Sequence, residues 1–167
     1  MKYATATLGR ALVVRLEDGD VVHEAIEAAA RATGIARAAV ILLGGADTGS
    51  RVVVGPEDDR AAVIVPMQRV LDAVHEMVGV GTLAPDEAGR PVLHLHAAFG
   101  REAQVTAGCV RLGVRTWLVG EAVMIELLDS DAVRRADPHT GFGLLDPGGR
   151  TASSWAHTGP GGRLASP

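Results

Sequence analysis

Short apolar segments, separated by stretches rich in glycine, proline and aspartate, recur along most of the chain. Runs of branched and apolar residues of this length, bounded by turn residues, are typical of β-strands. The segments that fit are residues 10–17, 38–43, 51–54, 61–65, 91–99, 104–110 and 116–128, the last holding one or two strands with Gly120 as a bend. The turn-rich stretch 55–59 predicts a hairpin between the third and the fourth segment.

Two other segments repeat apolar residues at helical spacing. In residues 21–33 the apolar side chains share one face, Asp20 is available to cap the first amide groups, and Gly34 stands where a C-terminal glycine is expected. Residues 66–78 begin at a proline and show the same spacing, although their branched residues also permit an extended strand. From the periodicity we predict a helix in both segments.

These elements predict an α+β protein, an α/β sandwich in which a mixed, mostly antiparallel sheet packs against one or two helices. The chain has 167 residues, 47% of them apolar, which is enough for one compact domain. After Pro147 the composition changes to glycine, proline and serine, which cannot build a core. We therefore expect a domain over residues 1–147 and a C-terminal tail over residues 148–167, in which the isolated Trp155 suggests docking on a neighbouring subunit.

The charge balance argues against a protein that holds nucleic acid by charge alone. Sixteen basic and twenty acidic side chains give a formal net charge of −4, and basic residues cluster only at Arg111 with Arg115 and at Arg134 with Arg135. Weak or no direct DNA binding is therefore expected. No apolar run approaches the roughly 20 residues of a membrane helix. Because the lone cysteine, Cys109, suits a reducing compartment, we expect a cytoplasmic protein with no membrane partner.

The strongest chemical signal is the His-Leu-His sequence at residues 94–96, within an apolar strand segment. Side chains alternate along a strand, so the imidazoles of His94 and His96 lie on the same face. If the next hairpin turns on Arg101 and Glu102, Cys109 lies directly opposite His94 on that face. The three side chains would then converge.

Two imidazoles and a thiolate suit a divalent, borderline-soft cation such as zinc, and they leave a fourth position for water, a substrate or another chain. His94, His96 and Cys109 are therefore the candidate ligands of one metal ion per chain. The alternative stays open at this point, because a register shift of one residue would turn Cys109 to the other face. The histidines would then be hydrogen-bonded core residues beside an inert thiol.

Three segments together resemble the PPC (or PCC) domain, a family of plants and prokaryotes. They are GRPVLHLHAAFGR from Gly89, TAGCVRLGV from Thr106 and DPHTGFGLLD from Asp137, and the resemblance extends over roughly residues 8 to 146. It implies an α/β sandwich on a largely antiparallel sheet and assembly as a homotrimer. In many prokaryotic members it also implies a metal held by an H-x-H pair and a third histidine.

His94 and His96 match the pair, and Cys109 stands at the position of the third histidine. Plant members of the family carry AT-hooks, whose R-G-R-P core lies in the minor groove. This chain has only the tripeptide at residues 89–91, so it resembles the prokaryotic stand-alone type without a hook.

Two functions are compatible with these observations. The first is a trimeric PPC-domain module with a metal site and a DNA-associated or regulatory role. The second is a metal-dependent enzyme in which zinc activates a water toward a small molecule, with Glu121, Glu126 or His139 as the general base.

Overall fold

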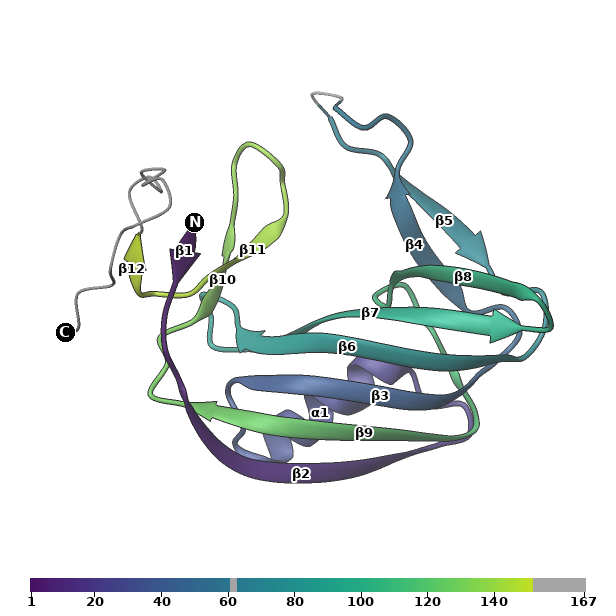
Figure 1. The fold of residues 1–167 in the computed structure, drawn as a ribbon, viewed down its shortest axis with the longest axis horizontal. Helices are drawn as coiled ribbons and strands as arrows, with labels where there is room; N and C mark the ends of the chain where they lie inside the picture. Colours follow the sequence, from purple (N-terminus) through teal and green to yellow (C-terminus); the bar gives the residue numbers. More distant parts are fainter. Residues whose placement is uncertain (61–62, 152–167) are drawn as a thin grey trace, which may run out of the picture.

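An eight-stranded antiparallel sheet forms the body of the molecule, and one helix packs against one of its faces (Figure 1). The computed structural model describes residues 1–60 and 63–151. In the sheet the strands lie in the order β2-β9-β3-β6-β7-β8-β4-β5. Their bounds are β2 Thr7–Glu17, β3 Ala38–Ala46, β4 Arg51–Pro56, β5 Pro66–Val70, β6 His75–Pro85, β7 Pro91–Arg101, β8 Gln104–Cys109 and β9 Thr116–Leu128.

Two small antiparallel sheets lie beside this body. The hairpin of β10 (Val133–Ala136) and β11 (Gly143–Asp146) follows β9, and β1 (Lys2–Tyr3) pairs with β12 (Arg150–Thr151). Part of the segment expected to be a tail therefore pairs with the beginning of the chain. Residues 152–167, with Trp155, lie outside the described residues, and so does any docking of that tryptophan.

The single helix of the described residues, α1 (Val22–Thr33), confirms the first of the two predicted helices. Its apolar stripe is buried against the sheet, and Gly34 ends it in the left-handed conformation, with φ at 71°. The predicted cap is wrong, because Val21 occupies the N-cap position without a side-chain bond. The Asp20 carboxylate instead accepts a hydrogen bond from the Glu17 N–H, 2.9 Å away, and closes the preceding turn.

The second predicted helix, over residues 66–78, is wrong. The segment forms β5 and the beginning of β6. Its apolar residues do not form one buried stripe, since Leu71 and Met77 are buried. Met67, Val70 and Val78, in contrast, are exposed. Backbone pairing decides the conformation instead, because Val70 lies opposite Arg51 in the β4–β5 ladder. The predicted hairpin is present, but the partner of β4 begins at Pro66 rather than within residues 61–65.

The expected fold class is corrected by these findings. Strands make up 58% and helix 8% of the structure, so the chain is a largely β protein and not a balanced α+β sandwich. Every ladder between named strands is antiparallel. Within the described ranges no helix is both long and apolar enough to cross a membrane.

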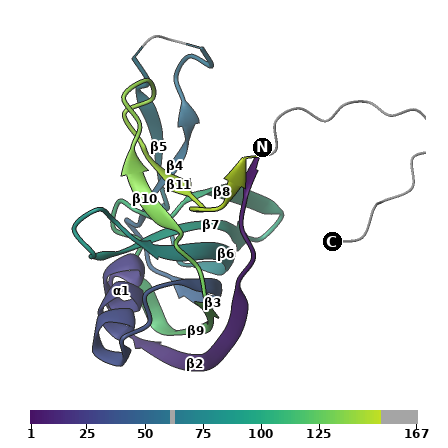
Figure 2. The ribbon, with the colours of Figure 1, turned by 90° about the vertical axis from the view of Figure 1, so that its left-hand side faces the viewer.

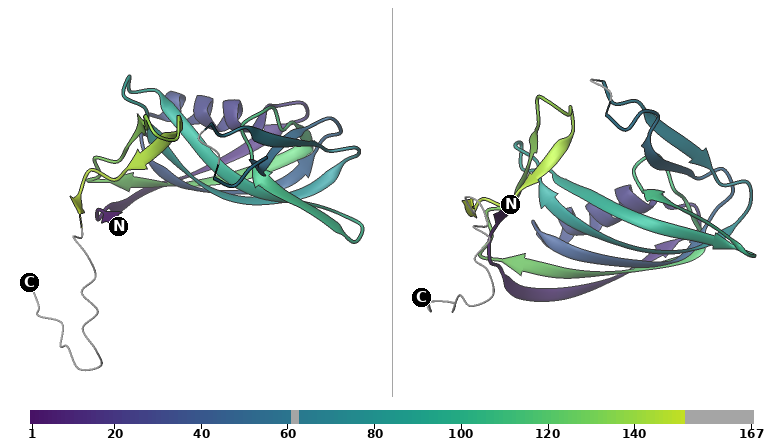
Figure 3. Two further views of the ribbon diagram at one scale, coloured as in Figure 1. Left: turned by 90° about the horizontal axis from the view of Figure 1, so that it is seen from above. Right: turned by 45° about the horizontal axis from the view of Figure 1, so that its top comes forward.

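The two faces of the large sheet differ in what covers them. Figure 2 and the left view of Figure 3 show α1 against one face, where Leu16, Leu42 and Leu95 are fully buried. Their neighbours in sequence point to the opposite face, which we call the open face. One row of directly paired residues crosses it, in the order Val13, Val123, Ile41, Val80, His96 and Cys109.

Candidate metal centre

Strand β7 places both candidate histidines on the open face. Leu93 and Leu95 alternate with them and are buried on the α1 side. The Nε2 atoms of His94 and His96 lie 3.1 Å apart, and their rings meet edge to face with centroids 5.0 Å apart. At that distance one ring donates a hydrogen bond to the other, so both side chains point to the same place.

Cys109 reaches this place from the end of β8, in a register that differs from the predicted one. Arg101 pairs with Gln104, so the turn falls on residues 102 and 103, and Cys109 lies opposite His96 rather than His94. The difference is two residues, and a shift of two keeps a side chain on the same face. The predicted face is therefore correct although the predicted partner is wrong.

The three side chains form a compact cluster. Their ligand atoms all lie within 4.8 Å of one another, and no other His, Cys, Asp or Glu of the described residues belongs to the group. A tetrahedral zinc ion with bonds of about 2.0–2.3 Å holds its nitrogen and sulfur ligands roughly 3.3–3.7 Å apart. Small side-chain movements bring this donor set to that spacing, so the residues present fit a zinc ion.

Burial shifts the pKa values of His94 and Cys109 in opposite directions. It lowers the pKa of His94, which keeps the imidazole neutral and its lone pair available. It raises the pKa of Cys109, a side chain only 6% exposed, while the charges of Arg111 and Arg134 partly offset this effect. A metal ion that binds here must therefore displace the thiol proton.

Arg134, which the sequence shows only as one of a basic cluster with Arg135, is a neighbour of the metal cluster. Its guanidinium donates to Thr82 through Nη2, at 3.0 Å to the carbonyl and 2.9 Å to Oγ1, and to the Val92 carbonyl through Nε at 3.3 Å. Thr82 lies directly opposite His94. Arg135, one residue further, is exposed and forms ion pairs with other residues. Strand alternation could have indicated that these two arginines face opposite ways.

The three general bases proposed from the sequence are not brought to the cluster. Glu126 lies on the α1 face and forms an ion pair with Arg10, and His139 lies in the exposed β10–β11 turn. Glu121 faces the same side as the histidines, but β9 is three strand spacings from β7, roughly 14 Å. None of them belongs to the group of ligand atoms.

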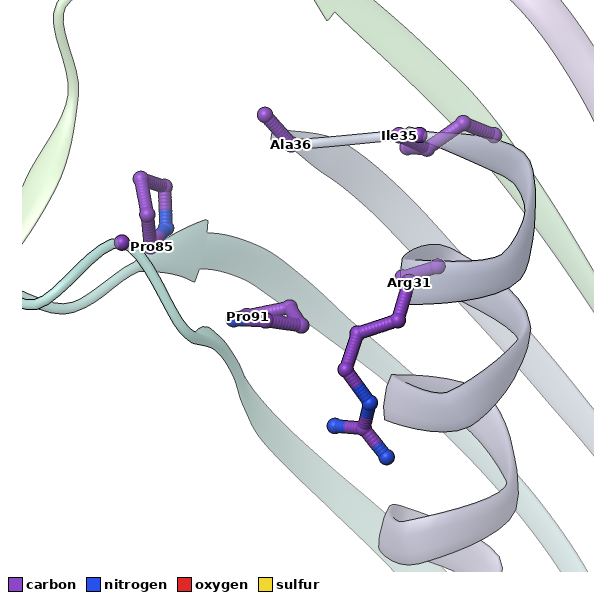
Figure 4. Close-up of a pocket in the computed structure, with 8 residues that line it drawn as sticks. Arg31, Ile35, Ala36, Pro85 and Pro91 are labelled. Carbon is purple, nitrogen blue, oxygen red and sulfur yellow. The ribbon is translucent and has the colours of Figure 1, made fainter.

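One hollow of the surface adjoins the cluster. It has a volume of about 380 Å³, is lined mainly by small and apolar residues of β4, β7 and β8, and includes His96. A second hollow of about 280 Å³ lies between the end of α1 and the β6–β7 turn, where Arg31 is its only charged residue (Figure 4). It contains no member of the cluster and no group suited to chemistry on a ligand.

The fold and the site define a small β-sheet domain with a candidate three-ligand metal centre on its open face. The sequence profile of the Plants and Prokaryotes Conserved (PCC) domain matches residues 3–128, and the chain belongs to this family. Comparison with the curated proteins finds no match.

Solved structures share the fold. The chain is similar to a metal-containing protein from Archaeoglobus fulgidus, with 21% identity and a TM-score of 0.74 over 87% of this chain and 99% of that one. A plant- and prokaryote-conserved protein from Pyrococcus horikoshii gives 21% identity and a TM-score of 0.74 over 87% and 97%. A candidate DNA-binding protein from Bacteroides thetaiotaomicron gives 17% identity and 0.68 over 85% and 97%.

Proposed function

We propose that this chain is a metal-binding PCC-domain protein that holds one divalent ion through His94, His96 and Cys109, and that the preferred ion is zinc. The observation that carries the proposal is the convergence of three ligand atoms within 4.8 Å on the open face. Imidazole nitrogen and thiolate sulfur together favour zinc over harder cations such as magnesium. The metal-containing relative from Archaeoglobus fulgidus is consistent with it.

Elemental analysis of protein purified without chelator tests the proposal. We expect about one equivalent of zinc per chain, a large loss of metal in His96→Ala, and full metal content in His139→Ala, which removes a histidine outside the cluster. Zinc should also raise the melting temperature, because a ligand at 100 times its dissociation constant stabilises the folded state by about 2.7 kcal/mol. Less than about a tenth of an equivalent, with melting unchanged by added zinc, would refute the site.

We also propose that the chain assembles as a homotrimer through the open face. Val13, Ile41 and Val80 belong to one row across the sheet and are 75%, 45% and 66% exposed. Contiguous exposed apolar surface of this kind marks an interaction site. Since the row continues to His96, the metal centre would lie at the edge of the contact, where a second chain or a water completes the coordination.

Light scattering after size exclusion measures the mass of the assembly. We expect three chains in the wild type and a smaller species in Ile41→Glu, which places a charge on the row two strands from His96. Ala28→Glu, at an exposed position of α1 on the other side of the sheet, is the matched control and should leave the mass unchanged. A monomeric wild type at micromolar concentration would contradict the trimer.

The role that suits such a module is structural or regulatory, in a reducing compartment such as the cytoplasm, where the Cys109 thiol persists. An association with DNA rests on relatives alone and would need a partner or an added segment to supply basic charge.

A metal-dependent enzyme is the second candidate. It is favoured by the exposure of both histidines, which leaves a bound ion reachable from solvent. Zinc lowers the pKa of a bound water to about 7.

A further inference from the structure

Arg134 is a buried cation that no carboxylate of the described residues pairs with. It is 6% exposed, and its three hydrogen bonds all go to neutral oxygens of Thr82 and Val92. No ion pair in the described part of the chain includes it, and its hydrogen bonds there use Nε and Nη2 but not Nη1. A buried charge is costly unless a counter-charge compensates it, so this guanidinium favours an anion that no carboxylate of the described residues supplies.

The guanidinium lies beside the metal cluster. Thr82, which holds Nη2 through both of its oxygens, is the direct cross-strand neighbour of His94. Directly paired residues of antiparallel strands have Cβ atoms about 4.5–5.5 Å apart. A group that binds Nη1 of the Arg134 guanidinium is therefore within reach of an ion held by His94.

The other charges around the cluster have the same sign. Arg111 follows Cys109 by two residues, lies over the Phe142 ring at 5.6 Å from its centroid and has no acidic partner among the described residues. The charged groups that act on His94 are Arg134, His96 and Arg111, all of them basic. With a divalent ion and one thiolate, the centre would hold an excess of positive charge.

We propose that the metal centre takes an oxyanion, a carboxylate or a phosphate group of a small molecule, which bridges the open coordination position of the metal and the guanidinium of Arg134. The inference rests on the proposed metal site. Arginine suits this role because its planar fork binds two oxygens of one anion at once. The hollow of about 380 Å³ beside His96, with its small and apolar lining, gives space for the uncharged part of such a ligand.

The test uses the full chain loaded with Co²⁺, whose visible absorption reports on the coordination of the metal. Inorganic phosphate and acetate are titrated separately, so that the two sources of an oxyanion are distinguished. We expect a saturable spectral change with at least one of them, and binding of the same anion that is about tenfold weaker or worse in Arg134→Gln. Arg135→Gln removes the same charge one residue away on the exposed side, and its affinity should stay within about twofold of the wild type.

The outcomes separate this inference from the metal site itself. If the wild type shows no cobalt spectrum, the metal site is refuted and the inference with it. If cobalt binds but neither anion changes the spectrum, the metal site stands and the inference is wrong, as it would be if an acidic side chain of a second subunit filled the place. Equal losses in Arg134→Gln and Arg135→Gln would also overturn it.

A second variant keeps the test decisive should Arg134→Gln fail to load cobalt. Arg111→Gln changes an exposed side chain next to the same cluster and is expected to weaken anion binding about threefold without altering the cobalt spectrum. An unchanged anion affinity in that variant would then count against the inference.

Discussion

His96 and Cys109 face each other directly across the ladder between β7 and β8. The cluster therefore depends on two kinds of geometry: alternation along β7, which aligns His94 with His96, and the register of the β7–β8 hairpin, which adds the thiol. Cys109 is buried at the junction with β4, where it also pairs with Val53, so its position is fixed from both sides.

The first prediction concerns the proton that zinc displaces. Because burial raises the pKa of Cys109 above its usual 9.0, the thiol is protonated at pH 7 in the metal-free chain, whereas the lowered pKa of His94 means that this imidazole has no proton to release. We predict that zinc binding at pH 7 releases one proton from Cys109. The affinity for zinc should rise about tenfold per pH unit as long as the thiol remains protonated.

Calorimetry in buffers of different ionisation enthalpy measures this proton. Cys109→Ser, which has no group that ionises in this range, is the control. It should bind zinc more weakly and should not release this proton. An affinity that does not change between pH 7 and 8 would contradict the assignment of Cys109 as a ligand.

The second prediction tests the support that β4 gives to Cys109. A Cβ added to Gly108 would collide with the backbone carbonyl of Val53, so Gly108→Ala must push β4 away from β8. We predict a loss of about 1–3 kcal/mol in the free energy of unfolding and weaker zinc binding. Gly100→Ala, in the same hairpin, meets nothing within 4 Å and serves as the control in thermal unfolding and zinc titration.

The third prediction follows from the ion pair between Arg10 and Glu126. The Arg10 guanidinium, with Nε 2.8 Å from Oε2, lowers the pKa of Glu126 from 4.5 to about 2. A depressed folded-state pKa gives stability that is complete above pH 4.5 and is lost as the pH falls toward 2. The stability advantage of the wild type over Glu126→Gln should therefore shrink over this window, as acid unfolding at fixed denaturant would show. A constant difference from pH 6 to pH 2 would argue that the charge of Glu126 contributes nothing.

Much of the sheet follows from the sequence because its signals are local. Segment 38–43 is continuously apolar and forms most of β3, with Val40 and Leu42 buried and Ile41 exposed on the open face. The H-x-H alternation fixes the face of two ligands without knowledge of the fold. Segment 66–78 could not be assigned in this way, since its apolar residues satisfy a helical period by coincidence while its conformation is set by pairing with β4, a contact distant in sequence.

The site was predictable to the same extent. The face of Cys109 was predicted correctly because the predicted and the observed turn both contain two residues, so the two pairings differ by two residues and leave Cys109 on the same side. Its partner, however, depends on which two residues form the turn. Glu102 adopts a positive φ of 54° there, a conformation that cannot be predicted from the sequence because glutamate rarely adopts it. Arg134 was missed because its burial arises from the β10–β11 hairpin, which reaches β6 and β7 only in the folded chain.

The fourth prediction concerns the end of the chain. We propose that residues 1–147 fold without residues 148–167, because the only described pairing that a truncation removes is the two-residue ladder of β12 with β1. Removal of residues 148–167 should leave the metal content intact and lower the melting temperature by only a few degrees, about 1 kcal/mol. A truncation of residues 152–167 retains β12 and is the control. Collapse of the melting temperature, or a monomer, would show that the C-terminal segment holds the assembly together.

The last prediction is that the protein alone binds duplex DNA weakly and without sequence preference. A net charge of −4 for each chain becomes −12 for three, which repels a phosphate backbone unless arginines gather on one face. The structure removes one of the two basic clusters seen in the sequence, since Arg134 is buried and Arg135 is paired with Glu87 and Asp146. Fluorescence anisotropy with mixed-sequence and AT-rich duplexes near physiological salt measures the affinity. Submicromolar binding that persists as salt is raised, with a clear preference for one duplex, would contradict this prediction and make DNA recognition the leading function.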